Sequence, residues 1–284
     1  MITAKTKLLA IIGDPVQHSL SPIMRNASFE ALGLDYLYVA LHVKKNDLEA
    51  AVRGMQALGF RGFNATMPHK KALCNLVDEI DEFADFCQAV NTVDIDGTLY
   101  GYNTDGPGTL DALKAVHADT SHAVVIGAGG AGRAIAYALA KDGSDLTILN
   151  RDASKASELA DKIRKAGLKA KGGGLDRLDA EVKKATTLCH VTPVGMHDNA
   201  TIVPAKLLRA DLTVMDAVYK KKDTKLITNA KKAGCITVPG LQMLLYQGRL
   251  SFERWTGKKA PMDVMEKALE NAFKTNESDG LEKK

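Results

Sequence analysis

Apolar runs alternate with helical patterns along most of the chain, and this alternation predicts an α/β fold. Residues 8–12 form an apolar run that is typical of a strand and stops at Gly13. Ser21 and Pro22 follow, and a capping serine with proline in the first turn marks a helix start. Alternating positions over residues 36–42 predict the next strand. This β-α-β order indicates a mainly parallel sheet covered by helices.

Two local patterns refine this first series. The helix that begins at Ser21 places Ile23, Ala27 and Leu32 on one side. Asp96-Gly97 separates two short strand-like runs, and this dipeptide between apolar segments predicts a hairpin.

A second series of strands and helices begins near residue 122. Its predicted strands cover residues 122–126, 145–149, 187–191 and 212–216. Between them, the glycine-rich residues 171–174 are interpreted as a loop. The polar residues 276–280 are expected to fray.

Composition and charge narrow the functional classes. With 284 residues, 45% of them apolar and 25% charged, the chain is long enough for one or two ordinary globular domains. The net charge of +4 is small, and a lysine run such as 220–222 is typical of a solvated loop, so we expect no nucleic-acid partner. The apolar run near the start is too short to span a membrane and lacks a cleavage site, so we expect no membrane partner.

The cysteines and histidines suggest neither a disulfide framework nor a metal site. The four cysteines are far apart in sequence and form no CxxC pair, as expected of reduced thiols in a cytoplasmic protein. The histidines lack ligand-like spacing with cysteines or acids, so no metal is expected.

The glycine-rich residues 127–132 match the pattern G-x-G-x-x-G. An apolar strand precedes the motif, and a strong helix-forming stretch follows it. Glycine permits the tight turn and lets the backbone approach a pyrophosphate at the positive end of the helix. This context favours dinucleotide binding over a tight turn without a ligand. The residues predicted to bind are Gly127, Gly129, Gly130, Ala131 and Gly132.

The residues after the next strand bear on the choice of cofactor. The sequence there includes Asn150, Arg151, Asp152 and Lys155. Arginine pairs with a 2′-phosphate, whereas an acidic residue accepts hydrogen bonds from ribose hydroxyls. Arg151 and Lys155 favour NADP. Asp152 opposes NADP if its carboxylate points inward, but it need not face the phosphate if it caps the following helix. We therefore expect NADP, with NAD as the alternative.

Polar clusters lie where the strands of the first series end. They are the segments SLSP at 19–22, NATMPHK at 64–70, AVNT at 89–92 and GYNTDG at 101–106. Parallel α/β sheets bind ligands beyond their strand ends. Taken singly, each cluster is ordinary loop chemistry, such as a turn asparagine, a solvated lysine or a capping aspartate. Together they supply hydroxyl, amide, ammonium and carboxylate groups suited to a polyhydroxylated acid.

These motifs resemble the shikimate dehydrogenase family over nearly the whole chain, with GAGGAG, the NR at 150–151, TPVGM at 192–196 and GLQMLLYQG at 240–248 continuing the match. The resemblance implies a substrate domain of residues 1–104 plus 240–284, a Rossmann-type NADP-binding domain of residues 105–239, and a cleft between them. It implies reversible NADPH-dependent reduction of 3-dehydroshikimate to shikimate, in the chorismate route to aromatic amino acids. The resemblance leaves the oligomeric state open between monomer and homodimer.

The family's site residues carry over position by position. By resemblance, Lys70 and Asp105 are the catalytic pair. The implied substrate-binding residues are Ser19, Ser21, Asn64, Thr66, Asn91, Tyr219 and Gln247. Beyond the glycine motif and Asn150, Arg151 and Lys155, the implied cofactor-binding residues are Thr192, Met196, Val218 and Gly240.

The chemistry of the reaction suits the catalytic pair. Hydride transfer to a carbonyl leaves an alkoxide that must be protonated, and the reverse reaction removes that proton. Lys70 can donate and accept the proton, and its charge stabilises the oxyanion. An unperturbed lysine has a pKa of about 10.4, so base catalysis near neutrality requires tuning or a positioned partner. Asp105 can orient the ammonium and hold the reacting hydroxyl.

The sequence departs from the family pattern at several positions. Histidine at 190 replaces the asparagine of the family's NxTPxGM motif, and Asp152 replaces a common threonine. A lone histidine on a strand is more often structural than catalytic, so we expect His190 to affect packing or cofactor contacts. The proline often found after Tyr219 is missing, which bears on the rigidity of that loop.

Two alternatives to the main interpretation stay open. The first is a quinate/shikimate dehydrogenase that uses NAD. Serine at both 19 and 21 resembles a shikimate-preferring member, since quinate-using relatives often carry threonine at the second position. The second is a nucleotide-binding regulator that has lost catalysis, against which the intact Lys70 and Asp105 argue.

Overall fold

The computed structural model describes residues 2–275, which divide into two compact units. Within the described residues, unit 1 comprises residues 2–104 and 247–275, and unit 2 comprises residues 105–246. The first division falls between Thr104 and Asp105, and the second falls inside helix α9 (Gly240–Thr256). The polar segment 276–280, expected to fray, lies outside the described residues.

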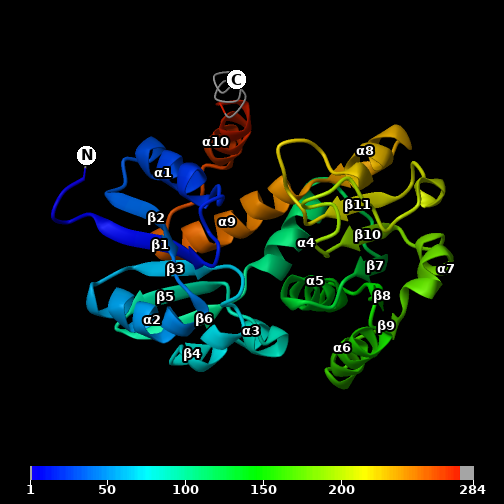
Figure 1. Cartoon of the computed structure of the whole chain (residues 1–284), viewed down its shortest axis with the longest axis horizontal. Helices are drawn as coiled ribbons and strands as arrows, with labels where there is room; N and C mark the ends of the chain where they lie inside the picture. The colour runs from blue at the N-terminus through cyan, green and yellow to red at the C-terminus, as the bar shows by residue number, and fades with distance from the viewer. Residues whose placement is uncertain (1, 276–284) are drawn as a thin grey trace. The chain divides into compact units, whose positions relative to one another are not determined.

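Unit 1 contains a mixed sheet with helices on both faces (Figure 1). Its strands are β1 (Lys7–Gly13), β2 (Tyr36–His42), β3 (Gly62–Ala65), β4 (Glu79–Ile80), β5 (Thr92–Asp96) and β6 (Thr98–Tyr102). Its helices are α1 (Ser21–Ala31), α2 (Leu48–Ala57), α3 (Glu82–Cys87) and α10 (Met262–Thr275), with the second part of α9 and short 3₁₀ turns at Lys45–Asp47 and Ala72–Asn75.

The strand order in unit 1 is β2-β1-β3-β5-β6-β4. β1 pairs in parallel with β2 and β3, as the β-α-β pattern predicted, while β5 and β6 form the predicted antiparallel hairpin around Gly97. Gly97 has a φ of +76°, a value that glycine adopts without steric cost.

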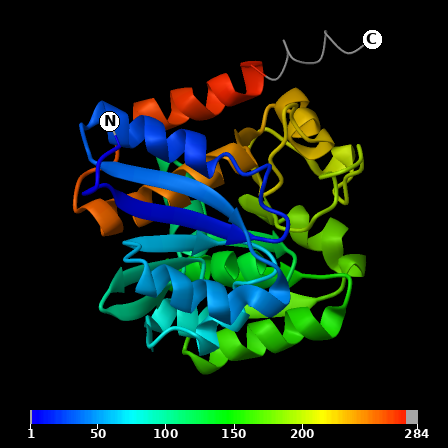
Figure 2. The same cartoon turned by 60° about the vertical axis from the view of Figure 1, so that its left-hand side comes forward.

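Side chains along β1 point alternately to the two faces of the sheet, so the strand contributes to a core on each face. Ala10 and Ile12 pack with Leu48 and Val52 of α2, so they face one side of the sheet. Helix α1 contacts β1 and β2, and Figure 2 shows it on the side of these strands opposite α2.

Helix α1 turns a partly polar face to the interior. Its buried residues are Ser21, Met24, Arg25, Ser28 and Phe29. The side that carries Ile23 and Leu32 is not the buried one, because Ile23 is 49% exposed and Leu32 is 41% exposed. The polar residues can occupy the buried face because they hydrogen-bond there: Ser28 Oγ donates to the Met24 carbonyl oxygen at 2.9 Å.

Ser21 does not cap α1, contrary to the interpretation of the sequence. It is the first helical residue, Leu20 holds the cap position, and no side chain caps the helix there. The Ser19 hydroxyl instead accepts the Ser21 amide N–H at 3.3 Å.

Unit 2 is a doubly wound parallel sheet. Its strands are β7 (His122–Ile126), β8 (Asp145–Leu149), β9 (Ala170–Gly173), β10 (Thr187–His190), β11 (Thr213–Asp216) and β12 (Ile236–Val238). Its helices are α4 (Asp105–Ala115), α5 (Gly130–Lys141), α6 (Ala153–Lys165), α7 (Leu178–Val182), α8 (Lys225–Lys232) and the start of α9, with 3₁₀ turns at Leu175–Arg177 and Ala205–Leu207.

The order β12-β11-β10-β7-β8-β9 reverses direction between β7 and β10, and neighbouring strands pair in parallel. Helices α7 and α8 pack on the face formed by Val124, Leu188 and Val214. Helices α5 and α6 contact the β7–β9 half of the sheet. This is the Rossmann arrangement, in which ligands bind beyond the strand ends where the order reverses.

The glycine-rich residues 171–174 are not a loop, because most of the segment is strand β9. A Cβ on Gly172 would lie 2.4 Å from the Ala156 carbonyl oxygen of α6. The glycines therefore let α6 pack closely on the edge strand, and they remove the apolar signal that identifies a strand.

Two general expectations concern membranes and cysteines. No helix within residues 2–275 is both long and apolar enough to cross a membrane. The four cysteines are free thiols, and burial raises the pKa of Cys189 to about 12.

Candidate active site

A network of buried amide and hydroxyl groups lies where β3 ends and β5 begins. Asn64 Nδ2 donates to the Asn91 carbonyl oxygen (3.1 Å) and to Thr92 Oγ1 (2.9 Å). Asn91 Oδ1 accepts from the Thr104 amide (2.8 Å), and Asn91 Nδ2 donates to Thr104 Oγ1 (3.0 Å). Thr104 Oγ1 donates to Gln247 Oε1 of α9 at 3.4 Å. The network therefore brings together three predicted substrate residues, Asn64, Asn91 and Gln247.

Arg25, which the sequence did not point to, is a fully buried part of this network. Its guanidinium donates to Asn64 Oδ1 and to the Gly248 carbonyl oxygen, both at 3.1 Å. The Tyr38 and Trp255 rings flank it at 5.0 Å and 4.9 Å. Among the described residues, no carboxylate pairs with this cation, and burial lowers the pKa of Arg25. The aromatic faces and the carbonyl oxygen partly replace the missing anion.

Asn64 uses its whole hydrogen-bonding capacity within the protein. A side-chain amide offers two donor hydrogens and two acceptor lone pairs. Both hydrogens go to Asn91 and Thr92, and Oδ1 accepts from Arg25 and from the Tyr38 hydroxyl, the latter at 2.7 Å. Asn64 is 5% exposed, so these four partners fix its amide in one orientation.

The predicted serines and Thr66 lie after the first strands of the unit. Ser21 opens α1 and is 3% exposed, while Ser19 is half-buried in the preceding turn. Thr66 follows β3, and its amide donates to the Ile12 carbonyl oxygen at 2.9 Å. A Cβ on Gly13 would lie 2.4 Å from Thr66 Cγ2. The absence of a side chain at residue 13 therefore allows Thr66 its place.

Lys70 stands on a firmly held turn. It is half-buried, and its carbonyl oxygen accepts the Val90 amide at 2.8 Å. The preceding His69 is buried, with Nε2 at 2.8 Å from the Val43 carbonyl oxygen. The neighbouring Lys71 is exposed. The backbone therefore presents these two adjacent lysines in different surroundings.

Two of the predicted catalytic and substrate-binding residues belong to unit 2. Asp105 is the first residue of α4 and is 4% exposed, and the Thr109 hydroxyl donates to its carbonyl oxygen at 2.8 Å. Tyr219 follows β11, and burial raises its pKa. The predicted catalytic pair is thus divided between units, with Lys70 in unit 1 and Asp105 in unit 2.

The glycine motif forms the turn from β7 into α5, and its glycines are suited to this turn for two different reasons. Gly127 has a φ of +119°, and its Cβ would lie 2.5 Å from the Val191 carbonyl oxygen. A Cβ on Gly132 would lie 2.2 Å from the Gly127 carbonyl oxygen. Gly129 and Gly130 are exposed, with no atom close to their Cβ positions. Gly127 and Gly132 allow close packing, whereas Gly129 and Gly130 leave the backbone at the helix start open.

This turn fits a dinucleotide. The cap residue of α5 is Gly129 and the first turn holds no acid, so α5 presents backbone amides and a positive dipole end to an anion. Ala131, also predicted to bind, is half-buried in that first turn.

The residues after β8 include Asp152, whose carboxylate would oppose NADP only if it faced the ribose. Asp152 caps α6 and accepts from the Ser154 amide (3.2 Å) and hydroxyl (2.6 Å). These hydrogen bonds, the Ser154 hydroxyl first, lower the pKa of Asp152. Asn150 Nδ2 donates to the Asp152 carbonyl oxygen at 3.0 Å, and Arg151 and Lys155 are exposed. The cap interpretation of Asp152 is therefore the one that its contacts support.

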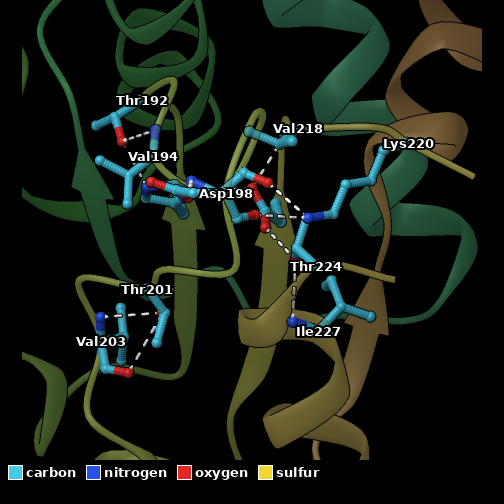
Figure 3. A network of polar contacts seen from close by, with 12 residues as sticks. Thr192, Val194, Asp198, Thr201, Val203, Val218, Lys220, Thr224 and Ile227 are labelled. Atoms are coloured by element: carbon cyan, nitrogen blue, oxygen red, sulfur yellow. Dashed lines mark hydrogen bonds and ion pairs between the residues drawn. The ribbon is translucent and has the colours of Figure 1, made fainter. Parts of the chain in front are cut away.

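The other predicted cofactor residues follow β10 and β11. Thr192 Oγ1 accepts the Val194 amide at 3.3 Å, and Met196 is 39% exposed in the same loop. Val218 is buried after β11, and a Cβ on Gly240 would lie 2.7 Å from the Val218 carbonyl oxygen. Gly240 therefore lets α9 begin against this loop. Figure 3 shows Thr192, Val194 and Val218 in these loops.

Family models match most of the chain. The shikimate dehydrogenase substrate binding domain matches residues 11–93, the shikimate/quinate 5-dehydrogenase model matches residues 111–192, and the shikimate 5′-dehydrogenase C-terminal domain matches residues 240–270. The shikimate dehydrogenase (NADP+) of Methanothermobacter thermautotrophicus is 48% identical over 280 residues, with 96% of this chain and 99% of that protein covered. The chain belongs to the shikimate dehydrogenase family.

Solved structures from this family agree. A shikimate dehydrogenase in complex with NADP+ is 42% identical, with a TM-score of 0.89 over 96% of this chain and 98% of that one. The Thermus thermophilus enzyme, in complex with NADP(H) and shikimate, is 37% identical, with a TM-score of 0.86 over 94% of this chain and 99% of that one. The fold predicted from the motifs, an α/β substrate domain with a Rossmann-type domain, is confirmed.

Sequence reasoning missed the residues that hold the site residues in place. Arg25, Tyr38 and Thr104 contact predicted substrate residues but match no motif on which the resemblance rests, save that Thr104 falls within GYNTDG without a role of its own. One signal was present for Arg25. It follows Ser21 by four positions on a helix, so it lies on the same face as a predicted site residue.

Proposed function

We propose that this protein is a shikimate dehydrogenase that catalyses the reversible NADPH-dependent reduction of 3-dehydroshikimate to shikimate, a step in aromatic amino-acid biosynthesis. The observation that carries the proposal is its similarity, at 48% identity over 96% of the chain, to a protein named shikimate dehydrogenase (NADP+). The buried polar network of unit 1 and the open glycine turn of unit 2 support it, because they match the chemistry of a polyhydroxylated acid and a dinucleotide.

The substrate residues have two kinds of role in this proposal. Ser19 and Ser21 bind the carboxylate, at the start of α1 where the helix dipole favours an anion. Thr66, Asn91 and Gln247, with Tyr219, hold the ring hydroxyls. Asn64 has no hydrogen-bonding position left for a ligand, so we assign it the positioning of Asn91 and Thr92.

Lys70 and Asp105 carry the proton chemistry. During reduction, the Lys70 ammonium donates a proton to the developing alkoxide and stabilises its charge. In the reverse direction, neutral Lys70 accepts the proton of the substrate hydroxyl. Asp105 orients the ammonium and accepts a hydrogen bond from that hydroxyl. Its position is set locally, because it opens α4 directly after Thr104, which Asn91 holds.

NADPH supplies the hydride when it is bound. Gly129, Gly130 and Ala131 offer the backbone amides at the start of α5 to the pyrophosphate, while Gly127 and Gly132 permit the turn. Asn150, Arg151 and Lys155 hold the adenosine end, with Arg151 pairing with the 2′-phosphate. Thr192, Met196, Val218 and Gly240 line the loops toward the nicotinamide.

The alternatives are less well supported. A quinate/shikimate dehydrogenase using NAD is not favoured, because relatives at 42–48% identity over nearly the whole chain are named shikimate dehydrogenase (NADP+), and Asp152 is occupied as a helix cap. A silent regulator is not favoured either, because the chain keeps both Lys70 and Asp105.

We further propose that the protein acts in the cytoplasm as a monomer or homodimer. Four free cysteines suit a reducing compartment. Light scattering during gel filtration measures the oligomeric state directly, and any larger assembly contradicts this proposal.

The test is absorbance of the reduced nicotinamide after mixing the protein with shikimate or quinate and with NADP+ or NAD+, in all four pairings. We expect rapid reduction of NADP+ by shikimate and slow or no reaction in the other pairings. Preferred use of NAD+ or equal use of quinate selects the first alternative. No reaction in any pairing, with NADPH still bound, selects the regulator.

A further inference from the structure

A buried histidine–aspartate pair joins the two loops that follow β10 and β11. His190 ends β10 and is 2% exposed, and Asp216 ends β11 and is 1% exposed. His190 Nδ1 lies 2.9 Å from Asp216 Oδ1, and His190 Nε2 lies 2.6 Å from Thr192 Oγ1. The register of the parallel strands places the two residues directly opposite each other.

Each polar atom of the pair has a defined partner. A carboxylate only accepts, so the proton of the His190–Asp216 hydrogen bond is on Nδ1. In neutral imidazole, Nε2 then accepts the Thr192 hydroxyl proton. Asp216 Oδ1 also accepts the Val218 amide at 3.1 Å, and Oδ2 accepts the Thr224 hydroxyl at 2.6 Å. The Thr224 hydroxyl caps α8 by accepting the Ile227 amide at 3.2 Å.

The network ends on backbone that the proposed function uses. At one end, the Thr192 hydroxyl holds the Val194 amide, and at the other, Asp216 holds the Val218 amide. Thr192 and Val218 are both proposed cofactor residues. These loops lie at the carboxyl ends of the strands beside the reversal of strand order, where a Rossmann sheet binds its ligand.

A second link joins the same loops farther from the sheet. Lys220 Nζ donates to the carbonyl oxygens of Gly195 (2.8 Å) and Asp198 (3.0 Å). Figure 3 shows Lys220 reaching toward the loop that carries Asp198. Unlike the His190–Asp216 pair, this link is half-buried or exposed, so water competes with it.

We infer that His190 and Asp216 form a positioning pair that locks the loops after β10 and β11 together in the shape that binds the nicotinamide half of NADPH. This inference rests on the proposed function. Burying two polar side chains costs free energy unless both are fully hydrogen-bonded, and here they are. The asparagine usual at position 190 in the family has an N–H donor bonded to its γ carbon, in the same way as Nδ1 of histidine. It has no atom that corresponds to Nε2 of histidine. His190 thus adds the link to Thr192.

The first measurement is amide hydrogen exchange on the unliganded protein, which requires no activity. In His190→Leu, which introduces an apolar side chain of similar size, we expect the Val194 and Val218 amides to exchange about tenfold faster, as loss of one hydrogen bond of about 1.4 kcal/mol implies. In His190→Asn, we expect fast exchange at Val194 only, because the link to Asp216 survives. Unchanged exchange at both amides in His190→Leu would contradict the inference, whatever the protein's function.

The second measurement separates the two halves of the cofactor. Dissociation constants are measured for NADPH, by its fluorescence, and for adenosine 2′,5′-bisphosphate, which lacks the nicotinamide half. In His190→Leu we expect NADPH to bind about tenfold more weakly and the bisphosphate to bind within about twofold of wild type. His190→Asn should fall between. Equal weakening of both ligands would show general damage to unit 2 and overturn the inference.

His122→Asn is the matched control, because His122 is an exposed histidine at the opposite end of a strand in the same sheet. It should leave both ligands and both amides unchanged. Failure of the proposed function has a different signature. In that case wild type itself would not bind NADPH or turn over shikimate, while the exchange rates would still respond to His190→Leu.

Discussion

In unit 1 the proposed substrate residue Asn91 is a side chain held by other side chains, whereas the glycine turn after β7 in unit 2 offers backbone amides held by packing. Asn91 is fixed by Thr104 and, through Asn64, by Arg25 and Tyr38. The turn after β7 is instead closely packed, because a Cβ on Gly132 would lie 2.2 Å from the Gly127 carbonyl oxygen. In the proposed function, side-chain networks set the pattern of hydroxyl recognition, and backbone amides suit a pyrophosphate that is the same in every dinucleotide.

The same contrast predicts how each unit fails. A substitution in unit 1 that removes one donor should weaken one function and spare the fold, because the remaining hydrogen bonds hold the network. A substitution at a packed glycine in unit 2 should damage fold and function together, because backbone cannot move aside cheaply.

The largest effect is expected for Lys70→Ala. Removing the proposed proton donor should lower kcat by about 10²–10⁴-fold, the usual contribution of general acid–base catalysis. NADPH binding and the melting temperature should stay near wild type, since Lys70 is a half-buried turn residue of unit 1. Steady-state kinetics and NADPH fluorescence measure the two quantities. Lys71→Ala, at the exposed neighbour, is the control, and near-normal turnover in Lys70→Ala would remove Lys70 from the mechanism.

Gly132→Ala and Gly130→Ala should separate packing from binding within one motif. The new Cβ at 132 would clash with the Gly127 carbonyl oxygen. We therefore expect the free energy of unfolding to fall by about 1–3 kcal/mol and the affinity for NADPH to fall as well. The Cβ at 130 meets no neighbour, so only affinity should fall. Thermal unfolding and NADPH titration distinguish the two. Equal melting temperatures for both variants would show that the turn is not fixed by packing.

A smaller effect is expected for Tyr38→Phe, which removes one of the two donors to Asn64 Oδ1 and keeps the ring. An underused buried acceptor costs about 1–3 kcal/mol, part of which should appear as a KM for shikimate raised about fivefold to tenfold. The dissociation constant of NADPH should not change. Tyr36→Phe is the control, since the Tyr36 hydroxyl makes only a 3.3 Å contact with the Trp255 carbonyl oxygen. A raised KM in the control and not in Tyr38→Phe would refute the role of the network.

The smallest effect is expected for Asp152→Asn. Because Asp152 caps α6, we expect the ratio of NADP+ to NAD+ use to change less than about threefold, while Arg151→Ala lowers it about tenfold or more. The pKa of Asp152 is lowered in the folded protein. Its cap therefore stabilises the fold above about pH 3.9, the ordinary pKa of aspartate, and this stabilisation is lost as the pH falls through the lowered pKa. Thermal unfolding of both forms across this pH range should show their difference vanish on the acid side. A large switch in cofactor preference would mean that Asp152 faces the ribose.

The parts of the fold that carry local signals could be predicted from the sequence. Strands β7 and β8 begin and end at the predicted residues, because apolar runs bounded by polar residues define buried parallel strands. Strand β9 was missed because its glycines allow close contact with α6 and supply no apolar side chains that would identify a strand. The buried face of α1 could not be identified from the sequence, because buried, hydrogen-bonded Arg25 and Ser28 look like surface residues in sequence.

The site shows the same limit. Motifs name the residues that we propose to contact ligands, but the residues that hold them depend on partners far along the chain. Arg25 and Gly248 are 223 positions apart, and no local pattern links them. His190 was expected to serve packing or cofactor contacts, but its partner Asp216 follows only from the order of the strands.

The most direct test of the difference between the units is a pair of constants, the KM for shikimate and the dissociation constant of NADPH, measured for Tyr38→Phe, His190→Leu and the double variant. We expect Tyr38→Phe to change mainly the first constant and His190→Leu mainly the second, with the two effects multiplying in the double variant. If either single variant changes both constants equally, unit 1 and unit 2 do not divide substrate binding and cofactor binding between them.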